Sequence, residues 1–169
     1  MSNNLEHHGT AEVCDLHAHE VRVLRPTFVS YGGKPSCSGE IVTLQLAEDN
    51  RTLKALLQTP GKGRVLVVDV SGALCAVVGD NLALHAINHG WSGIVVQGYI
   101  RDVKALADMP IAIWALGTYP RRSEKRAEGQ QDVTLKFGGV EMKSGDFLYA
   151  DEDGILIADA QFEDVLFTL

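Results

Sequence analysis

The chain has 169 residues, and its 15 Lys and Arg against 22 Asp and Glu give a formal net charge of −7 at pH 7. The length suits one domain, and 46% hydrophobic residues supply enough apolar surface for a core, so a disordered chain is excluded. The acidic balance argues against a nucleic-acid partner, and no apolar run approaches the roughly 18 residues of a membrane span. We therefore expect a cytoplasmic protein, with a flexible polar leader over residues 1–10 and a single domain over residues 11–169.

The three cysteines, Cys14, Cys37 and Cys75, are widely spaced and odd in number. This pattern favours free, largely buried thiols over a disulfide framework. The six histidines add no spacing typical of a metal site.

The first third of the chain predicts short elements. We expect a helix over residues 11–21 and an extended piece over residues 27–31 that ends in a glycine turn. Apolar and polar residues then alternate over residues 39–46, which indicates a half-buried strand. Leucines at helical spacing predict a two-turn helix over residues 51–58, which ends before Pro60.

The middle of the chain differs in pattern. Nearly continuous apolar runs occupy residues 64–70, 93–98 and 111–116, and helical segments over residues 80–89 and 101–108 separate them. Continuous apolar strands that alternate with helices predict a parallel β-α-β-α-β core that is buried on both faces.

A polar segment over residues 119–131 follows and predicts a surface loop, with an anion site or a subunit contact as the alternative. The close of the chain then predicts a terminal helix from about Ala160, preceded by four short alternating strands at residues 133–137, 139–142, 147–150 and 154–157. The fold class is therefore α/β with an added β layer on the parallel core.

Ligands of open α/β sheets bind beyond the carboxyl ends of the strands, and two polar segments lie there. The first is Gly79-Asp80-Asn81-Leu82, at the start of a predicted helix. A glycine lets a ligand approach the backbone closely, and the N–H groups of Asn81 and Leu82 could hold a small carboxylate or phosphate. The alternative is an Asp or Asn that only caps the helix.

The second segment is Arg101-Asp102, directly after a predicted strand. The arginine fork can bind a carboxylate or an enolate oxygen, and the aspartate can hold Mg²⁺ or Mn²⁺. The alternative is a helix-start aspartate beside a solvated arginine. Twenty residues separate Asp80 from Arg101, and such a D-x20-R-D spacing arises by chance in roughly one of 30 chains of this length.

With this spacing in view, the chain resembles the RraA-like family from about Cys14 to Phe162. That family joins regulators of ribonuclease E activity to divalent-metal-dependent 4-hydroxy-4-methyl-2-oxoglutarate aldolases. Besides D-x20-R-D, the resemblance rests on five segments: residues 64–69, residues 98–102, Phe137-Gly138-Gly139-Val140, Ser144-Gly145-Asp146 and Ala150-Asp151 with Gly154-Ile155.

The resemblance implies a swivelling β/β/α fold of the phosphohistidine-domain type and a ring-shaped homotrimer with its site near a subunit boundary. It also implies roles for the motif, because D-x20-R-D separates the aldolases from members that act only as regulators. Asp102 would ligate the metal, Arg101 would bind substrate, and residues 79–82 would hold the pyruvyl carboxylate. Asp80 would orient or deprotonate a water molecule.

The function expected from this resemblance is cleavage of 4-hydroxy-4-methyl-2-oxoglutarate, or a related small 2-oxo acid, to pyruvate with Mg²⁺ or Mn²⁺ as cofactor. Decarboxylation of oxaloacetate is the expected companion activity, since it passes through the same enolate. The alternative is a non-catalytic regulator that binds and inhibits ribonuclease E or its degradosome partners. A third reading is an idle structural trimer.

Overall fold

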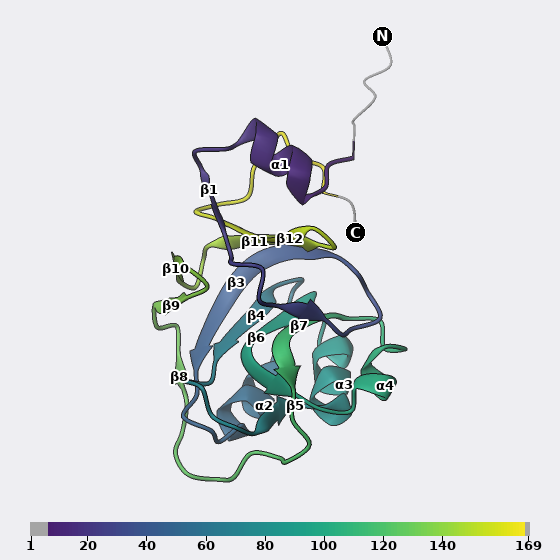
Figure 1. Ribbon diagram of the computed structural model, residues 1–169, viewed down its shortest axis with the longest axis vertical. Helices are drawn as coiled ribbons and strands as arrows, with labels where there is room; N and C mark the ends of the chain where they lie inside the picture. Colours follow the sequence, from purple (N-terminus) through teal and green to yellow (C-terminus); the bar gives the residue numbers. More distant parts are fainter. Residues whose placement is uncertain (1–6, 168–169) are drawn as a thin grey trace.

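The computed structural model describes residues 7–167, and Figure 1 shows a large mixed sheet with helices beside it. The helices are α1 (Thr10–Leu16), α2 (Arg51–Leu57), α3 (Asp80–Asn88) and α4 (Val103–Leu106). The first strands are β1 (Val21–Val23), β2 (Val29–Ser30), β3 (Cys37–Gln45), β4 (Val65–Asp69), β5 (Ala76–Val78) and β6 (Gly93–Ile100). The later strands are β7 (Ala112–Thr118), β8 (Gln130–Gln131), β9 (Leu135–Phe137), β10 (Val140–Met142), β11 (Phe147–Asp151) and β12 (Gly154–Ala158).

The predicted parallel core is confirmed. Strands β3, β4, β6 and β7 lie side by side and pair in parallel, with α2 between β3 and β4 in the sequence, α3 between β4 and β6, and α4 between β6 and β7. The strands have buried side chains on both faces because helices cover one face and further strands cover the other. The carboxyl ends of these strands therefore meet at one edge, on the side of α2, α3 and β5 in Figure 1.

Strand β3 joins the two layers of the sheet. Its first half, from Cys37 to Glu40, pairs antiparallel with β11, and its second half, from Ile41 to Gln45, pairs in parallel with β4. Strands β12 and β1 continue the antiparallel side beyond β11. The expected β layer added to an α/β core is thus present as part of one mixed sheet.

Three apolar clusters hold these layers together. The largest lies between the parallel strands and α2 and α3, where Leu53 and Ala83 pack with Ile94. A second cluster fills the opposite face, between the parallel strands and strands β9 to β12. The smallest places Val13 of α1 against Tyr149, on the outside of the antiparallel layer.

Two expected helices are wrong in extent or kind. Helix α1 ends at Leu16 instead of Val21, because Val21 begins β1 and pairs with Ala158 of β12. No helix forms over residues 160–167, all of which the structure describes. There the backbone bonds to distant partners, since the Phe162 N–H donates to Tyr149 Oη at 2.9 Å and the Leu166 carbonyl accepts from His8 at 2.9 Å.

The expected leader and the cysteines have different outcomes. Residues 1–6 of the expected leader lie outside the described residues, while Thr10 already begins α1 and its N–H donates to Asp151 Oδ2 at 2.7 Å. All three cysteines are free thiols, as predicted, and Cys37 and Cys75 are buried. Within residues 7–167, no helix is long and apolar enough to cross a membrane.

Candidate active site

Strands β5 and β6 bring the two halves of the D-x20-R-D motif together. They are parallel neighbours with Val78 opposite Ile100, so Gly79 and Arg101, the next residue of each strand, arrive at the same edge. The Arg101 N–H donates to the Val78 carbonyl at 3.0 Å and fixes this register. The sequence pattern did not predict β5, whose three buried residues form a strand too short for periodicity to reveal.

Asp102 takes an unusual backbone conformation at this edge. Its φ of 63° and ψ of 34° lie in the left-handed region, which aspartate and asparagine tolerate better than most residues. This conformation delays α4 to Val103, two residues later than expected. The Asp102 carboxylate turns back to α3, where its Oδ2 accepts the Asp80 N–H at 3.2 Å.

Gly79 makes room for that carboxylate. A Cβ at this position would collide with Asp102 Oδ2, although the φ of −137° is open to any residue. A side chain at position 79 would therefore force the Asp102 carboxylate to move, while the backbone conformation of Gly79 is open to any residue. The sequence predicted that a ligand approaches the backbone at this glycine. In the structure the group that approaches it is the Asp102 carboxylate.

Asp80 is the first residue of α3, and Gly79 is the N-cap. The Asp80 carboxylate accepts the Asn81 N–H at 2.7 Å, so this amide, which was expected to hold a ligand anion, already has a partner. Asp80 itself is exposed to solvent, and the Leu82 side chain is buried. The capping alternative is wrong, because Gly79 is the N-cap and no side chain caps the helix.

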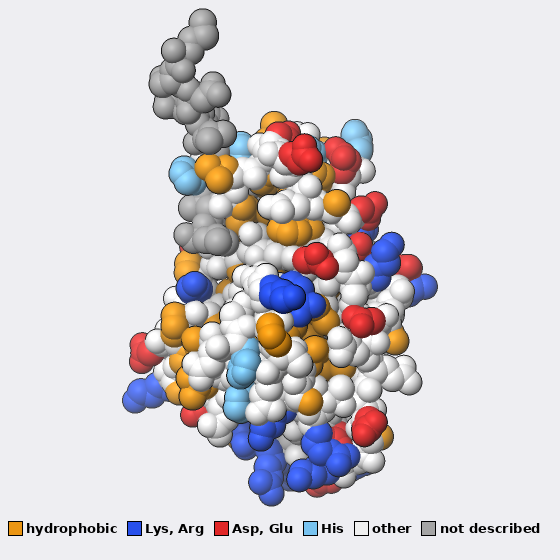
Figure 2. Space-filling model, turned by 180° about the vertical axis from the view of Figure 1, so that it is seen from behind, with side chains coloured by type: hydrophobic (Ala, Val, Ile, Leu, Met, Phe, Trp, Pro, Cys, Tyr) orange, Lys and Arg blue, Asp and Glu red, His pale blue; other side chains and the backbone are white. Residues whose placement is uncertain are grey.

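A cavity of about 470 Å³ opens at this edge, within the size range of small-molecule sites. All six motif residues line it: Gly79, Asp80, Asn81, Leu82, Arg101 and Asp102. Eight residues that the motif did not predict complete the lining: Asn50, Lys54, Ala76, Val77, Val78, Leu84, His85 and Arg122. Figure 2 shows Lys and Arg side chains gathered at this end of an otherwise acidic protein.

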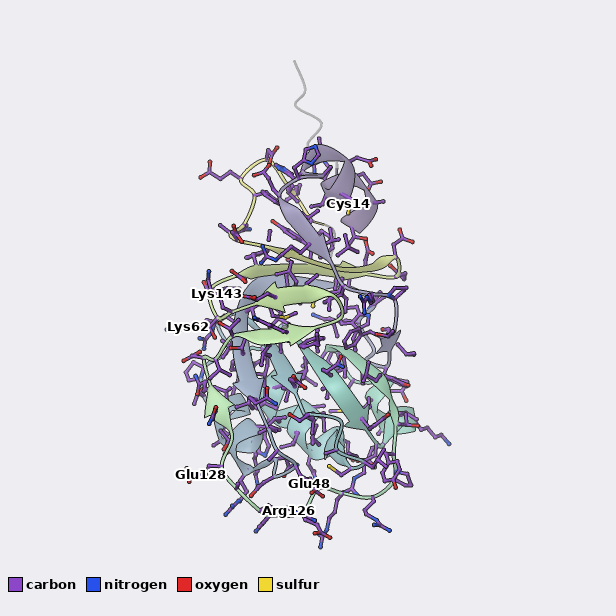
Figure 3. All side chains as sticks on the ribbon, turned by 60° about the vertical axis from the view of Figure 1, so that its left-hand side comes forward. Cys14, Glu48, Lys62, Arg126, Glu128 and Lys143 are labelled. Atoms are coloured by element: carbon purple, nitrogen blue, oxygen red, sulfur yellow. The ribbon has the colours of Figure 1, made fainter. Side chains whose placement is uncertain are left out.

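A buried carboxylate beside the cavity holds the 119–131 loop next to α2. Asp49, which is 1% exposed, accepts the Arg51 guanidinium at 2.6 Å and the Arg126 N–H at 2.9 Å. The Arg51 guanidinium lowers the pKa of Asp49 to about 2, against the burial that raises it. The Arg126 side chain pairs with Glu48 at 3.0 Å, and Figure 3 shows these two at the same end of the molecule.

The donor set at the cavity suits a hard divalent cation. No group of three or more His, Cys, Asp or Glu able to hold a metal forms among residues 7–167. Mg²⁺ commonly binds through one or two carboxylates and takes its other oxygens from water and substrate. The exposed Asp102 carboxylate, which lines the cavity, fits this mode as a single protein ligand.

Comparison of the chain with models of known protein families identifies its family. Residues 10–157 match the model of the RraA-like family, described as Aldolase/RraA. The chain belongs to the RraA-like family. The match spans both layers of the sheet, from α1 to β12, and includes every residue of the D-x20-R-D motif.

Two relatives of this RraA-like protein illustrate how it compares in sequence. A protein of Pseudomonas syringae pv. tomato named "Putative 4-hydroxy-4-methyl-2-oxoglutarate aldolase" is 46% identical over 153 residues, which cover 90% of this chain and 94% of the relative. A protein of Aromatoleum aromaticum with the same name is 43% identical, over 89% of this chain and 96% of the relative.

Two solved structures share the fold closely. The RNA-processing inhibitor RraA from Thermus thermophilis has a TM-score of 0.89 at 39% identity, over 96% of this chain and 99% of that one. A Geobacillus kaustophilus structure titled as an S-adenosylmethionine:2-dimethylmenaquinone methyltransferase also has a TM-score of 0.89, at 41% identity, over 92% and 97% of the two chains. These names differ while the fold is shared, so the activity has to be argued from the site.

Proposed function

We propose that this RraA-like protein is a divalent-metal-dependent aldolase that cleaves 4-hydroxy-4-methyl-2-oxoglutarate, or a related 4-hydroxy-2-oxo acid, to pyruvate. Oxaloacetate decarboxylation is its companion activity. The observation that carries the proposal is the meeting of Arg101, Asp102 and the start of α3 at one cavity. The names of the P. syringae and A. aromaticum relatives support the same activity.

In this proposal Asp102 would hold Mg²⁺ or Mn²⁺. The bound cation supplies Lewis-acid chemistry, which stabilises negative charge on the oxygens of a 2-oxo acid. Asp102 is suited to the role because its carboxylate is exposed and bonds only to the Asp80 N–H among residues 7–167. The first turn of α3 presents the positive end of the helix to the substrate carboxylate.

Arg101 and Asp80 act on the reacting groups. Asp80 accepts the proton of the C4 hydroxyl through a water molecule, and the C3–C4 bond then breaks, with its electron pair passing to the pyruvate enolate. The Arg101 fork donates to the enolate oxygen, where the negative charge develops. The C4 carbon leaves as the carbonyl of the second product, and the proton returns to C3 to give pyruvate. Oxaloacetate loses CO₂ to form the same enolate.

The proposal includes the homotrimer, with the cavity near a subunit boundary. Leu84 lines the cavity and is 48% exposed, while Leu74 and Val103 are 64% and 38% exposed. Large apolar side chains that stay in water beside a polar cavity are typical of a surface that another subunit covers. The mass in solution, measured by light scattering, tests this part alone.

The experiment that tests the function is pyruvate release, coupled to lactate dehydrogenase, from 4-hydroxy-4-methyl-2-oxoglutarate and from oxaloacetate. Each substrate is assayed with Mg²⁺, with Mn²⁺ and after chelation, and a blank with metal but no protein removes uncatalysed decarboxylation. We expect turnover with metal and its loss on chelation. The absence of metal-dependent turnover of both substrates would sink the aldolase assignment.

The second candidate function is inhibition of ribonuclease E by binding it. The observation in its favour is the structural match to the RNA-processing inhibitor from T. thermophilis. An acidic surface can compete with RNA for a basic protein face, and this needs no catalytic residue. A pull-down with ribonuclease E at moderate salt tests it: retention supports the regulator, and no retention removes this candidate.

A further inference from the structure

Two histidines of α3 form a neighbouring pair that the proposed aldolase chemistry does not use. His85 and His89 are four residues apart, and the His89 N–H donates to the His85 carbonyl at 3.1 Å, so the helical geometry continues to His89. Side chains at this spacing lie on the same face of a helix. The two ring centroids are 6.4 Å apart, and Figure 2 shows histidine side chains next to one another on the surface beside the Lys and Arg cluster. The helix thus brings two imidazoles together, although the histidines predicted no metal site from the sequence alone.

A backbone carbonyl fixes the tautomer of the His89 ring. His89 Nδ1 lies 2.8 Å from the His85 carbonyl oxygen, and because a carbonyl oxygen only accepts, Nδ1 carries the proton and donates it. In the neutral ring the lone pair is then on Nε2. Metal-ligating histidines commonly donate their other ring N–H to a backbone carbonyl in this way, which sets the tautomer and the orientation of the ring. His89 Nε2 is therefore free and oriented as the nitrogen of a metal ligand would be.

The pair differs from the histidines near the chain ends. Both ring nitrogens of His17 contact carboxylates at 2.9 Å, and His8 Nδ1 accepts the Leu166 N–H at 3.2 Å. In the part of the chain that the structure describes, the His85 ring and His89 Nε2 form no hydrogen bond, and both side chains are half-buried. His85 also lines the cavity of the candidate active site. The nitrogens of this pair are thus available to a ligand.

We propose that His85 and His89 form a binding site for Zn²⁺ on the wall of the cavity. Imidazole nitrogen suits Zn²⁺, whereas Mg²⁺ prefers oxygen ligands. Two histidines at this helical spacing are also the zinc-binding pair of the H-E-x-x-H motif. Each would bind Zn²⁺ through a nitrogen at about 2.0–2.1 Å, with water completing the four ligands.

This site is separate from the proposed Mg²⁺ or Mn²⁺ site at Asp102. Asp102 follows β6 and offers carboxylate oxygen, whereas the histidine pair lies at the C-terminal end of α3 and offers nitrogen. A large excess of Mg²⁺ therefore competes for the oxygen site and leaves the histidine pair free. Zinc binding at the pair is independent of the proposed function and needs no turnover to be measured.

Calorimetric titration of the full chain with Zn²⁺, in a large excess of Mg²⁺, tests the site. The variants are His85→Gln, His89→Gln and the double variant, because glutamine remains polar and favours a helix. We expect the Zn²⁺ affinity of this site to fall at least tenfold in each single variant, and one equivalent of bound Zn²⁺ to be lost in the double variant. Unchanged Zn²⁺ binding in the folded double variant would overturn the site.

The matched control removes two histidines that lie elsewhere. His7 and His19 are exposed, and neither lines the cavity. The double control His7→Gln with His19→Gln removes the same number of imidazoles, and it is expected to bind Zn²⁺ as the wild-type protein does. A loss of binding in the control as large as in the double variant would assign the effect to general surface chelation and overturn the site.

Imidazole NMR identifies the ligating nitrogens directly. In the metal-free protein, the long-range ¹H–¹⁵N spectrum is expected to show His89 as the Nδ1–H tautomer. One equivalent of Zn²⁺ is expected to shift His89 Nε2 and one ring nitrogen of His85, with the His17 signals unchanged. Zinc-dependent shifts confined to other histidines would overturn the proposal. If the protein releases no pyruvate from either substrate but shows these shifts, the aldolase assignment fails and the zinc site stands.

Discussion

The charged side chains at the antiparallel end of the sheet differ in their pairing from the cations that line the cavity, although Arg51 and Arg126 beside the cavity are paired. At the antiparallel end, Arg22 pairs with Asp146 at 3.1 Å and with Asp159 at 2.7 Å, and His17 lies between Glu20 and Asp164 at 2.9 Å from each. At the carboxyl end of the parallel strands, Lys54, Arg101 and Arg122 line a cavity without a carboxylate partner among residues 7–167.

This contrast separates structural charges from charges available to a ligand. Paired groups at the antiparallel end connect β1 and α1 to the C-terminal segment, so their removal is expected to affect stability. Unpaired groups at the cavity contribute little to folding, so their removal is expected to affect binding and catalysis while stability changes little. Each prediction below tests one side of this division.

The largest effect is expected from Asp102→Asn. Asparagine keeps the size of the side chain and tolerates the left-handed backbone, but it loses the charge that holds a divalent cation. We expect metal-dependent pyruvate release to fall about 10³-fold with an unchanged melting temperature. Full turnover in this variant would remove Asp102 as the metal ligand.

Arg101→Lys is expected to cost about 100-fold in kcat. Lysine keeps the charge but is a point donor. It therefore does not reproduce the planar guanidinium fork that donates to the enolate oxygen. The kinetic measurement is kcat against KM for the same substrate. A variant with wild-type kcat would show that the guanidinium geometry plays no part in the chemical step.

Gly79→Ala is expected to reduce activity about tenfold, because the new Cβ collides with Asp102 Oδ2 and displaces the carboxylate. The matched control is Gly117→Ala, where the nearest heavy atom is Tyr99 Cδ1 at an ordinary 3.5 Å. Mn²⁺ affinity, measured by calorimetry, is expected to weaken in Gly79→Ala alone. Equal affinity in the two variants would contradict the role of the glycine.

Arg22→Met tests the antiparallel end. It leaves the Asp146 side chain, which is 4% exposed, without its guanidinium partner, so the melting temperature is expected to fall by about 5 °C. Pyruvate release at 25 °C is expected to stay at the wild-type level, since Arg22 lies on β1, away from the cavity. A large loss of activity in the folded variant would break the division between the two ends.

The smallest effect is expected at His17. Its hydrogen bond to Glu20 raises the pKa of the imidazole above 6.5, with a further contribution from Asp164 and an opposing one from burial. A raised folded pKa contributes stability that is present below the unfolded value and is lost as pH rises through the folded value. His17→Gln is expected to remove this part of the pH dependence, a change of about 2 °C in the difference between melting temperatures at pH 5.5 and 8.5. An unchanged difference would show that the ion pairs are not formed in solution.

The sequence predicts most of the parallel core because continuous apolar runs leave few alternatives to buried strands. It predicts the wrong state for residues 160–167, where the backbone bonds to Tyr149 and His8 instead of forming helical turns. The sequence also predicts too long a helix before Val21. There the pairing of β1 with β12 determines the structure in place of the local helix propensity. Such long-range contacts leave no periodic signal in the sequence.

The candidate site is predictable only in part. The two polar segments selected from the sequence, residues 79–82 and 101–102, contribute six lining residues, because β5 and β6 end at the same edge. Lys54 and Arg122 lie outside these segments, and they reach the cavity through the Asn50 bond to β5 and the loop contacts with Ala76. For Arg122, the sequence signal was the polar composition of residues 119–131, for which an anion site was an alternative to a surface loop.

The most direct test of the central claim is a crystal structure of the protein with Mn²⁺ and pyruvate, read by the anomalous signal of manganese. The account predicts one strong anomalous peak at bonding distance from an Asp102 carboxylate oxygen, with pyruvate between Arg101 and the start of α3. Manganese bound at another site in catalytically active crystals, with no peak beside Asp102, would contradict it.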